Sequence, residues 1–214
     1  MPKNLGQKYE ETIRKVLRKR DLLPKLLKGN DAGFKHKGVR YYIEVKNVSA
    51  PDYGQKGLVW SEAGGWEWRK KDVTTDFYDA LGVKNYISPT FKPKRYTVQK
   101  EKLTFQDKQF DQINFEKSGI PLAGADCLFD YYAKKDCYYI QVEGLGFYYM
   151  KRDIANLVVP QFTPTLSLRL RAKTHHSTPV HAYSFFAVIN AHTNAVLKSK
   201  YDLEEAVGDF PPFE

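Results

Sequence analysis

Residues 41–47, YYIEVKN, form the segment that most restricts how this chain can fold. Successive side chains of a strand point to opposite faces, so Glu44 and Lys46 share one face while Ile43 and Val45 share the other. One face is therefore apolar, and the other carries a carboxylate next to an amine. Such a strand belongs in a sheet that packs on a core, and its charged pair marks a candidate site.

The residues before this strand place further carboxylates near it. Residues 7–20 carry apolar side chains at helical spacing, which predicts a helix with Glu10 at the border of its buried stripe. Residues 29–47 are typical of a hairpin, whose first strand opens at Asp31 and whose second strand contains Glu44. We therefore expect one group of side chains at the mouth of the sheet: Glu10, Asp31, Glu44 and Lys46.

This combination of side chains suits the hydrolysis of a phosphodiester. Carboxylates are hard oxygen ligands for Mg²⁺, and the bound ion can activate water and stabilise charge on the scissile phosphate. A neighbouring lysine can orient or deprotonate that water and add positive charge to the transition state. The alternative is an exposed ion pair between Glu44 and Lys46, which is common on strand surfaces and contributes little to stability.

The arrangement resembles the PD-(D/E)xK nuclease superfamily, to which many restriction endonucleases and archaeal Holliday-junction resolvases belong. The matching motifs are GQKYEETI with Glu10, NDAGF with Asp31, and IEVK with Glu44 and Lys46. Asn30 stands where the family name has proline. The likeness runs from the predicted helix to the end of the second strand and does not extend to the rest of the chain.

The resemblance implies a restriction-endonuclease-like fold, which is an α/β or α+β arrangement with a mixed central β-sheet flanked by helices. It also implies a role for each matching residue. Asp31 and Glu44 would bind Mg²⁺, for which Mn²⁺ can substitute. Glu10 would support a second ion or the water, and Lys46 would position or activate the attacking water.

The charge of the whole chain favours a polyanionic partner. The 214 residues include 34 Lys and Arg against 25 Asp and Glu, a net charge of +9, and basic surfaces bind phosphates by releasing counterions. The candidate DNA-binding residues lie in two stretches: Gln55, Lys56, Arg69, Lys70 and Lys71 in the first, and Arg169, Arg171 and Lys173 in the second. The second group alternates with leucines in LSLRLRAK, so the solvent face of a half-buried strand explains it equally well.

We expect a single nuclease domain over residues 1–214. Its predicted parts are a catalytic core with a hairpin at 1–87, an irregular basic excursion at 88–124, a β meander at 125–190 that makes the C-terminal half rich in strands, and a tail at 191–214.

Two further patterns refine these parts. Residues 57–71 predict a second hairpin with Gly64 and Gly65 as its turn, and TDFYDALGV predicts a short helix that stops at Gly82. Residues 138–144, YYIQVEG, are a near twin of YYIEVKN. The twin has Gln141 in place of the key glutamate and no lysine after it, so we interpret it as a structural strand.

The resemblance, together with the basic composition, implies a Mg²⁺-dependent endodeoxyribonuclease, restriction-like and site-specific. A Holliday-junction or branched-DNA resolvase is the alternative among enzymes, and a non-catalytic basic nucleic-acid-binding protein is the alternative outside them. The expected partner is DNA, and a homodimer is left open. We expect no membrane and a cytoplasmic location, because no apolar run approaches the roughly 20 residues of a membrane span and the first residues lack a secretion signal.

Overall fold

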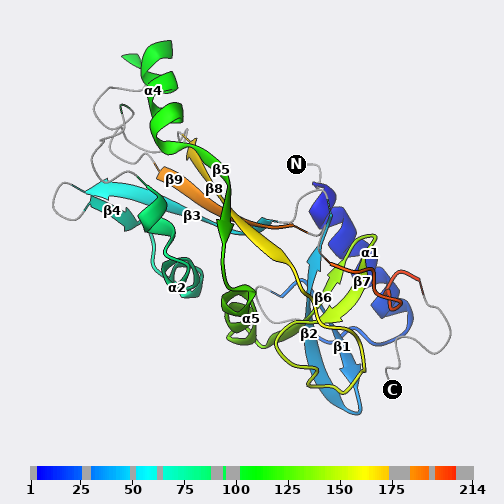
Figure 1. Cartoon of the computed structure of the whole chain (residues 1–214). Coiled ribbons are helices and arrows are strands. Elements are labelled where there is room, and N and C mark those ends of the chain that lie inside the picture. Colours follow the sequence, from blue (N-terminus) through cyan, green and yellow to red (C-terminus); the bar gives the residue numbers. More distant parts are fainter. Residues whose placement is uncertain are drawn as a thin grey trace. The chain divides into compact units, whose positions relative to one another are not determined.

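The chain forms two compact units, each with a β-sheet of its own (Figure 1). The computed structural model describes residues 4–25, 30–48, 52–61, 65–87, 94, 102–173, 184–192 and 196–205. Unit 1 comprises Met1–Pro51, Ala125–Pro164 and His192–Glu214, and unit 2 comprises Asp52–Gly124 and Thr165–Ala191. The combination of helices with a mixed sheet confirms the expected α/β or α+β class.

Unit 1 is built around a four-stranded mixed sheet. Its elements are α1 (Leu5–Lys19), β1 (Ala32–His36), β2 (Val39–Lys46), α5 (Ala125–Ala133), β6 (Cys137–Val142) and β7 (Gly146–Tyr149). The strand order is β1-β2-β6-β7, with β2 and β6 parallel and the two outer pairs antiparallel. Parallel neighbours need a long crossover, and here the chain passes through unit 2 and α5 between β2 and β6.

Helix α1 covers one face of this sheet. Its apolar side chains recur at helical spacing, and Tyr9, Ile13 and Leu17 are buried in one core cluster with Ile43 and Val45 of β2. The helix predicted from this spacing is confirmed, although it begins two residues earlier, after an asparagine that caps its first turn.

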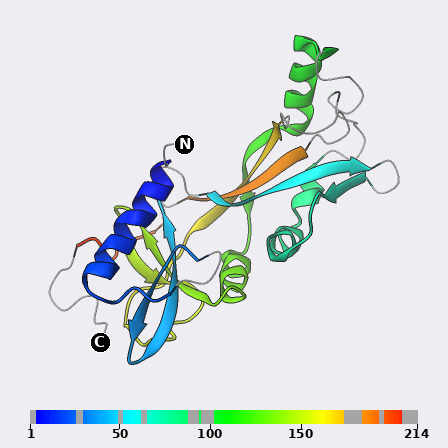
Figure 2. The same ribbon diagram turned by 180° about the vertical axis from the view of Figure 1, so that it is seen from behind.

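Helix α5 covers the opposite face (Figures 1 and 2). The β meander predicted over 125–190 is wrong here, because ADCLFDYYA is helical in spite of its tyrosine and phenylalanine content. Its buried side chains are Leu128, Phe129, Tyr131 and Tyr132, which is helical spacing. The strands that follow do not form one meander either, since β6 and β7 belong to the sheet of unit 1 and later strands to the other sheet.

Unit 2 contains a five-stranded sheet of order β4-β3-β9-β8-β5. Its strands are β3 (Asp52–Ser61), β4 (Gly65–Trp68), β5 (Lys117–Leu122), β8 (Thr165–Lys173) and β9 (Ser184–His192). Its helices are α2 (Val73–Ala80), the short η1 (Val83–Tyr86) and α4 (Phe105–Phe115). The stretch at 88–124, predicted to be an irregular excursion with a strand or short helix, includes an eleven-residue helix and a six-residue strand.

The smaller predictions for this unit agree with the structure where it describes them. Strands β3 and β4 pair antiparallel as the predicted second hairpin. Of its two predicted turn residues, Gly64 lies outside the described residues and Gly65 is the first residue of β4. Helix α2 ends before Gly82, which has φ of 64° and takes the left-handed conformation that favours glycine after a helix. Among the helices that the structure describes, none has the length and apolar character needed to cross a membrane.

The segment 196–205 brings the chain back to unit 1. The amide of Phe147 donates to the carbonyl oxygen of Tyr201 at 2.7 Å, and the amide of Ser199 donates to the carbonyl of Leu145 at 2.8 Å. This part of the predicted tail therefore packs along β7, while residues 206–214 lie outside the described part of the chain.

Candidate active site

The β1–β2 hairpin places three of the four predicted site residues. Its turn at Lys37 and Gly38 has φ of 49° and 75°, the pair of left-handed residues that joins two strands directly. The register pairs Ala32, the first residue of β1, with Ile43 of β2. Asp31 therefore lies immediately before β1, beside the strand that carries the Glu-x-Lys motif. The predicted hairpin is confirmed, and its first strand begins at Ala32, one residue after the predicted start at Asp31.

Glu44 lies on the α5 side of β2 and is buried, with an exposed fraction of 6%. Its Oε1 atom lies 2.5 Å from Nζ of Lys46 and accepts a hydrogen bond from the hydroxyl of Tyr132 at 2.8 Å. A buried carboxylate is costly unless it is paired and hydrogen-bonded, and these two donors meet that requirement. The pair is therefore not the exposed surface ion pair that the sequence offered as an alternative.

Asp31 is held against the same strand. Its Oδ2 accepts a hydrogen bond from the backbone amide of Val45 at 3.1 Å. Burial, followed by the negative charge of Glu44, raises the pKa of Asp31 from 3.8 to about 7, and Lys46 opposes this change. The two carboxylates are thus close enough for the charge of one to oppose ionisation of the other.

Glu10 approaches the site from α1. Its carboxylate is half-buried, and burial raises its pKa, while the charges of Arg14 and Lys46 oppose the rise and Glu44 adds to it. The charge of Glu10 therefore interacts with both residues of the Glu-x-Lys motif. All four residues predicted to form the site, Glu10, Asp31, Glu44 and Lys46, therefore lie within electrostatic reach of one another.

Arg14 is part of this site and was not predicted from the sequence. Its Nε donates to the backbone carbonyl of Asp31 at 2.5 Å, and its Nη2 lies 3.5 Å from Oε2 of Glu10. One guanidinium thus ties α1 to the start of β1. The available signal was its position four residues after Glu10, where oppositely charged side chains meet on a helix.

Tyr132 was also missed. It lies on α5, in a stretch predicted to be a strand, and 88 positions separate it from its partner Glu44. No local pattern could have identified this contact, because it depends on the tertiary packing of α5 against the sheet.

The twin strand β6 lies directly beside β2, but its register is shifted. Glu44 pairs with Ile140, and Val45 pairs with Gln141, so Gln141 points to the α1 side, away from Glu44. There Gln141 is fully buried and donates from Nε2 to the hydroxyl of Tyr9 at 3.0 Å and to Oδ1 of Asp202 at 2.8 Å. These contacts are those of the structural strand that the sequence predicted.

The first group of predicted DNA-binding residues lies in unit 2. Gln55 and Lys56 lie on β3, and Arg69, Lys70 and Lys71 follow β4, where all three are exposed. Lys56 forms an ion pair with the carboxylate that caps α2, so part of its charge is already neutralised. The four residues of the candidate active site, by contrast, all belong to unit 1.

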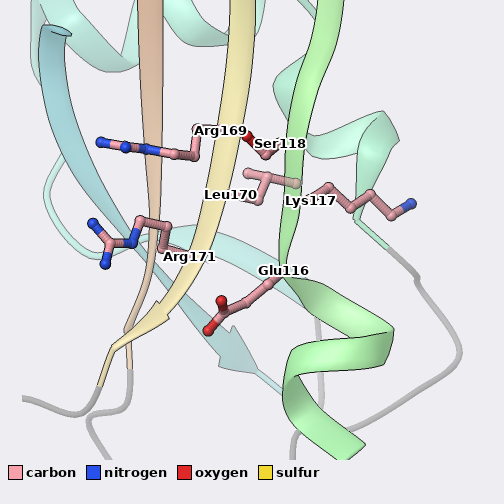
Figure 3. Close-up of a pocket in the computed structure, with 6 residues that line it drawn as sticks. All are labelled: Glu116, Lys117, Ser118, Arg169, Leu170 and Arg171. Carbon is pink, nitrogen blue, oxygen red and sulfur yellow. The ribbon is translucent and has the colours of Figure 1, made fainter. Parts of the chain in front are cut away.

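The second group lies on β8, beside a cavity of about 200 Å³ (Figure 3). Arg169 and Arg171 extend to the same side of the strand, while Lys117 of the neighbouring β5 extends away from them. Nη2 of Arg169 pairs with Oδ2 of Asp52 at 3.1 Å, and its buried Nε has no hydrogen-bond partner among the described residues. Arg171 is exposed, and the side chain of Lys173 lies outside the described residues.

Within the described ranges, no three His, Cys, Asp or Glu side chains are grouped in a way that could hold a metal ion by themselves. Comparison with known proteins found no matching family model, no similar curated protein and no similar solved structure.

Proposed function

We propose that this protein is a Mg²⁺-dependent endodeoxyribonuclease whose active site lies in unit 1. The observation that carries the proposal is the buried Glu44 carboxylate beside Asp31, whose pKa is raised to about 7 by burial and by the charge of Glu44. Negative charge that collects at a buried position is stabilised by a cation, and perturbed carboxylates of this kind are typical of functional sites.

The candidate ligands fit Mg²⁺ although they are only two carboxylates. Mg²⁺ keeps several waters and is usually bound by one or two carboxylates together with substrate phosphate, so a group of three protein ligands is not required. Asp31 and Glu44 would hold the ion. The bound ion would lower the pKa of a water and stabilise the charge that develops on the phosphate.

The chain's own residues would complete the site. Lys46, with its ammonium group next to Glu44, would orient the attacking water and add positive charge beside the phosphate. Arg14 would keep Asp31 in place through the backbone carbonyl and would hold Glu10 beside it. Because Glu10 already has this partner, its role would be to support the water or a second ion and not to hold the first ion.

The topology of unit 1 supports a restriction-endonuclease-like core as part of the proposal. A helix with an acidic residue, a strand that follows Asp31 and a strand with Glu-x-Lys occur in the order that the resemblance requires. The two strands are neighbours in a mixed sheet that has helices on both faces. Site-specific cleavage remains the preferred form of the activity, and cleavage of branched DNA is the alternative.

Cleavage of supercoiled plasmid tests the proposal. We expect the wild-type chain to nick or linearise the plasmid with Mg²⁺ or Mn²⁺, and not with Ca²⁺, which binds oxygen ligands but substitutes poorly in this chemistry. Linear and four-way-junction DNA in the same assay separates site-specific cleavage from junction resolution. Binding of DNA without cleavage under every metal condition would favour the non-catalytic binding protein, and undiminished cleavage in excess EDTA would exclude the metal mechanism.

A further inference from the structure

We propose that Tyr132 is a positioning residue that holds the Glu44 carboxylate in the orientation needed to bind the divalent cation. The inference rests on the proposed function, because it concerns the same metal site. It assigns a role to α5, an element that lies outside every motif shared with the nuclease superfamily.

The two contacts on Glu44 fall on the same oxygen atom. Tyr132 donates to Oε1 at 2.8 Å, and Nζ of Lys46 lies 2.5 Å from that oxygen. Among the described residues, these are the partners of the carboxylate, so Oε2 is the oxygen that a cation would take. A hydrogen bond that fixes one oxygen of a metal-binding carboxylate also fixes the direction of the other.

Tyr132 is held more rigidly than Lys46. The tyrosine is 2% exposed, and its ring packs edge-on against Tyr131 with a centroid separation of 5.0 Å. The lysine has a long flexible stem, and the proposed chemistry requires its ammonium group to act on water and phosphate. The tyrosine hydroxyl is therefore the contact that can stay on Glu44 throughout the reaction.

A second cation strengthens this hydroxyl as a donor. Nζ of Lys135 lies 5.0 Å from the centroid of the Tyr132 ring, within the range of a cation–π interaction. A positive charge over the ring draws electron density away from the hydroxyl, which makes its proton a better donor to a carboxylate. Lys135 thus supports the contact between Tyr132 and Glu44 without touching the site itself.

Direct titration of the metal-free full chain with Mn²⁺, by calorimetry or by the electron paramagnetic resonance of the free ion, tests the proposal without relying on activity. We expect Tyr132→Phe to weaken Mn²⁺ binding by about tenfold or more, the range measured when a partner of a metal ligand is removed. Lys135→Met, which removes the cation that lies over the rings of Tyr131 and Tyr132 and keeps the Tyr132 hydroxyl, should weaken it by about twofold.

Tyr148→Phe is the matched control. Tyr148 belongs to the same unit and is 1% exposed, and its hydroxyl lies 2.7 Å from the carbonyl oxygens of both Leu145 and Leu197, so the variant also loses a buried phenol hydroxyl. We expect it to lower the melting temperature and leave Mn²⁺ affinity unchanged. A purely structural role for Tyr132 would make the two variants behave alike.

The outcomes separate the inference from the proposed function. If the wild-type chain binds no Mn²⁺, the metal site and the inference fall together. If the wild type binds Mn²⁺ and a folded Tyr132→Phe binds it within twofold as tightly, the inference is wrong while the proposed function stands. If Tyr132→Phe does not fold, Lys135→Met decides, and unchanged Mn²⁺ affinity in that variant overturns the inference.

Discussion

The backbone amide of Val45 donates a hydrogen bond to Oδ2 of Asp31 at 3.1 Å, which fixes the carboxylate before β1 against the strand that carries the Glu-x-Lys motif. This contact favours the ionised form of Asp31, but burial and the charge of Glu44 outweigh it and raise the pKa to about 7. The folded protein therefore holds a proton that the unfolded chain releases near pH 4, and this difference makes stability depend on pH.

The sign of that dependence gives the first prediction. Because the folded-state pKa of Asp31 is above its ordinary value of 3.8, the free energy of unfolding of the metal-free protein should decrease as pH rises from about 4 to about 7. Each unit of pKa shift corresponds to about 1.4 kcal/mol, so the decrease amounts to a few kcal/mol. Asp31→Asn, which keeps an oxygen for the Val45 amide, should remove this loss.

Urea unfolding of both proteins at pH 5 and pH 8, in the presence of EDTA, measures the effect. We expect Asp31→Asn to be more stable than the wild type at pH 8 and the difference to shrink at pH 5. Equal pH dependence in the two proteins would mean that Asp31 titrates at its ordinary pKa and that neither burial nor the charge of Glu44 raises it.

The second prediction concerns the Glu-x-Lys pair. Glu44→Gln and Lys46→Ala should each reduce cleavage by at least about a hundredfold, because each removes a metal ligand or a charge that stabilises the transition state. Lys46→Ala should also lower stability, since Glu44 is buried and would keep, among the described residues, Tyr132 as its partner. Plasmid cleavage, gel shift and thermal melting of the same samples separate these effects.

Glu143→Gln is the control for that experiment. Glu143 follows the twin strand β6, and its charge acts on Glu204 on the α1 side of the sheet. We expect its cleavage rate to stay near that of the wild type. Loss of cleavage in Glu143→Gln with normal cleavage in Glu44→Gln would place the active site on the other strand.

Some elements of this fold could be predicted from the sequence because the pattern that specifies each of them lies within a short stretch of the chain. The spacing of Tyr9, Ile13 and Leu17 predicted α1, and a glycine turn between two apolar runs predicted the β1–β2 hairpin. Helix α5 was predicted incorrectly, because its tyrosine and phenylalanine content was given more weight than the helical spacing of Leu128 and Tyr132. The pairing of strands into two sheets depends on long-range contacts that no short pattern contains.

The same distinction applies to the site. Asp31, Glu44 and Lys46 lie within one hairpin, so a motif could bring them together, and Glu10 could be placed by the periodicity of its helix. The burial of Glu44 could not be predicted, because it depends on the α5 tyrosine 88 residues away. Alternation along β2 gave the correct face for Glu44, but it gave no means of telling a solvated face from one covered by a helix.

The third prediction tests the packing of segment 196–205 on β7. Gly146 has φ of 107°, and a Cβ atom there would lie 2.4 Å from the carbonyl oxygen of Tyr201. Gly146→Ala should therefore cost the strain of a left-handed backbone and also displace Tyr201, for a total loss of roughly 2 kcal/mol or more. Gly144 also has a positive φ, of 72°, but nothing lies within 4 Å of the added atom, so Gly144→Ala should cost only about 1 kcal/mol. Equal losses of stability in urea unfolding would show that the segment does not pack against Gly146.

The last prediction separates the two arginines of β8. Arg171 is exposed and can reach a phosphate, whereas Arg169 already pairs with Asp52. A lost phosphate contact reduces the slope of log K against log salt by about 0.9 for duplex DNA. We expect a reduction of that size for Arg171→Ala, a smaller one for Arg169→Ala, and none for Lys151→Ala, whose ammonium pairs with Asp130.

Gel shifts over a range of salt concentrations measure the slopes. An unchanged slope for Arg171→Ala would mean that this face of β8 is ordinary solvated surface and that DNA binding depends on other basic residues.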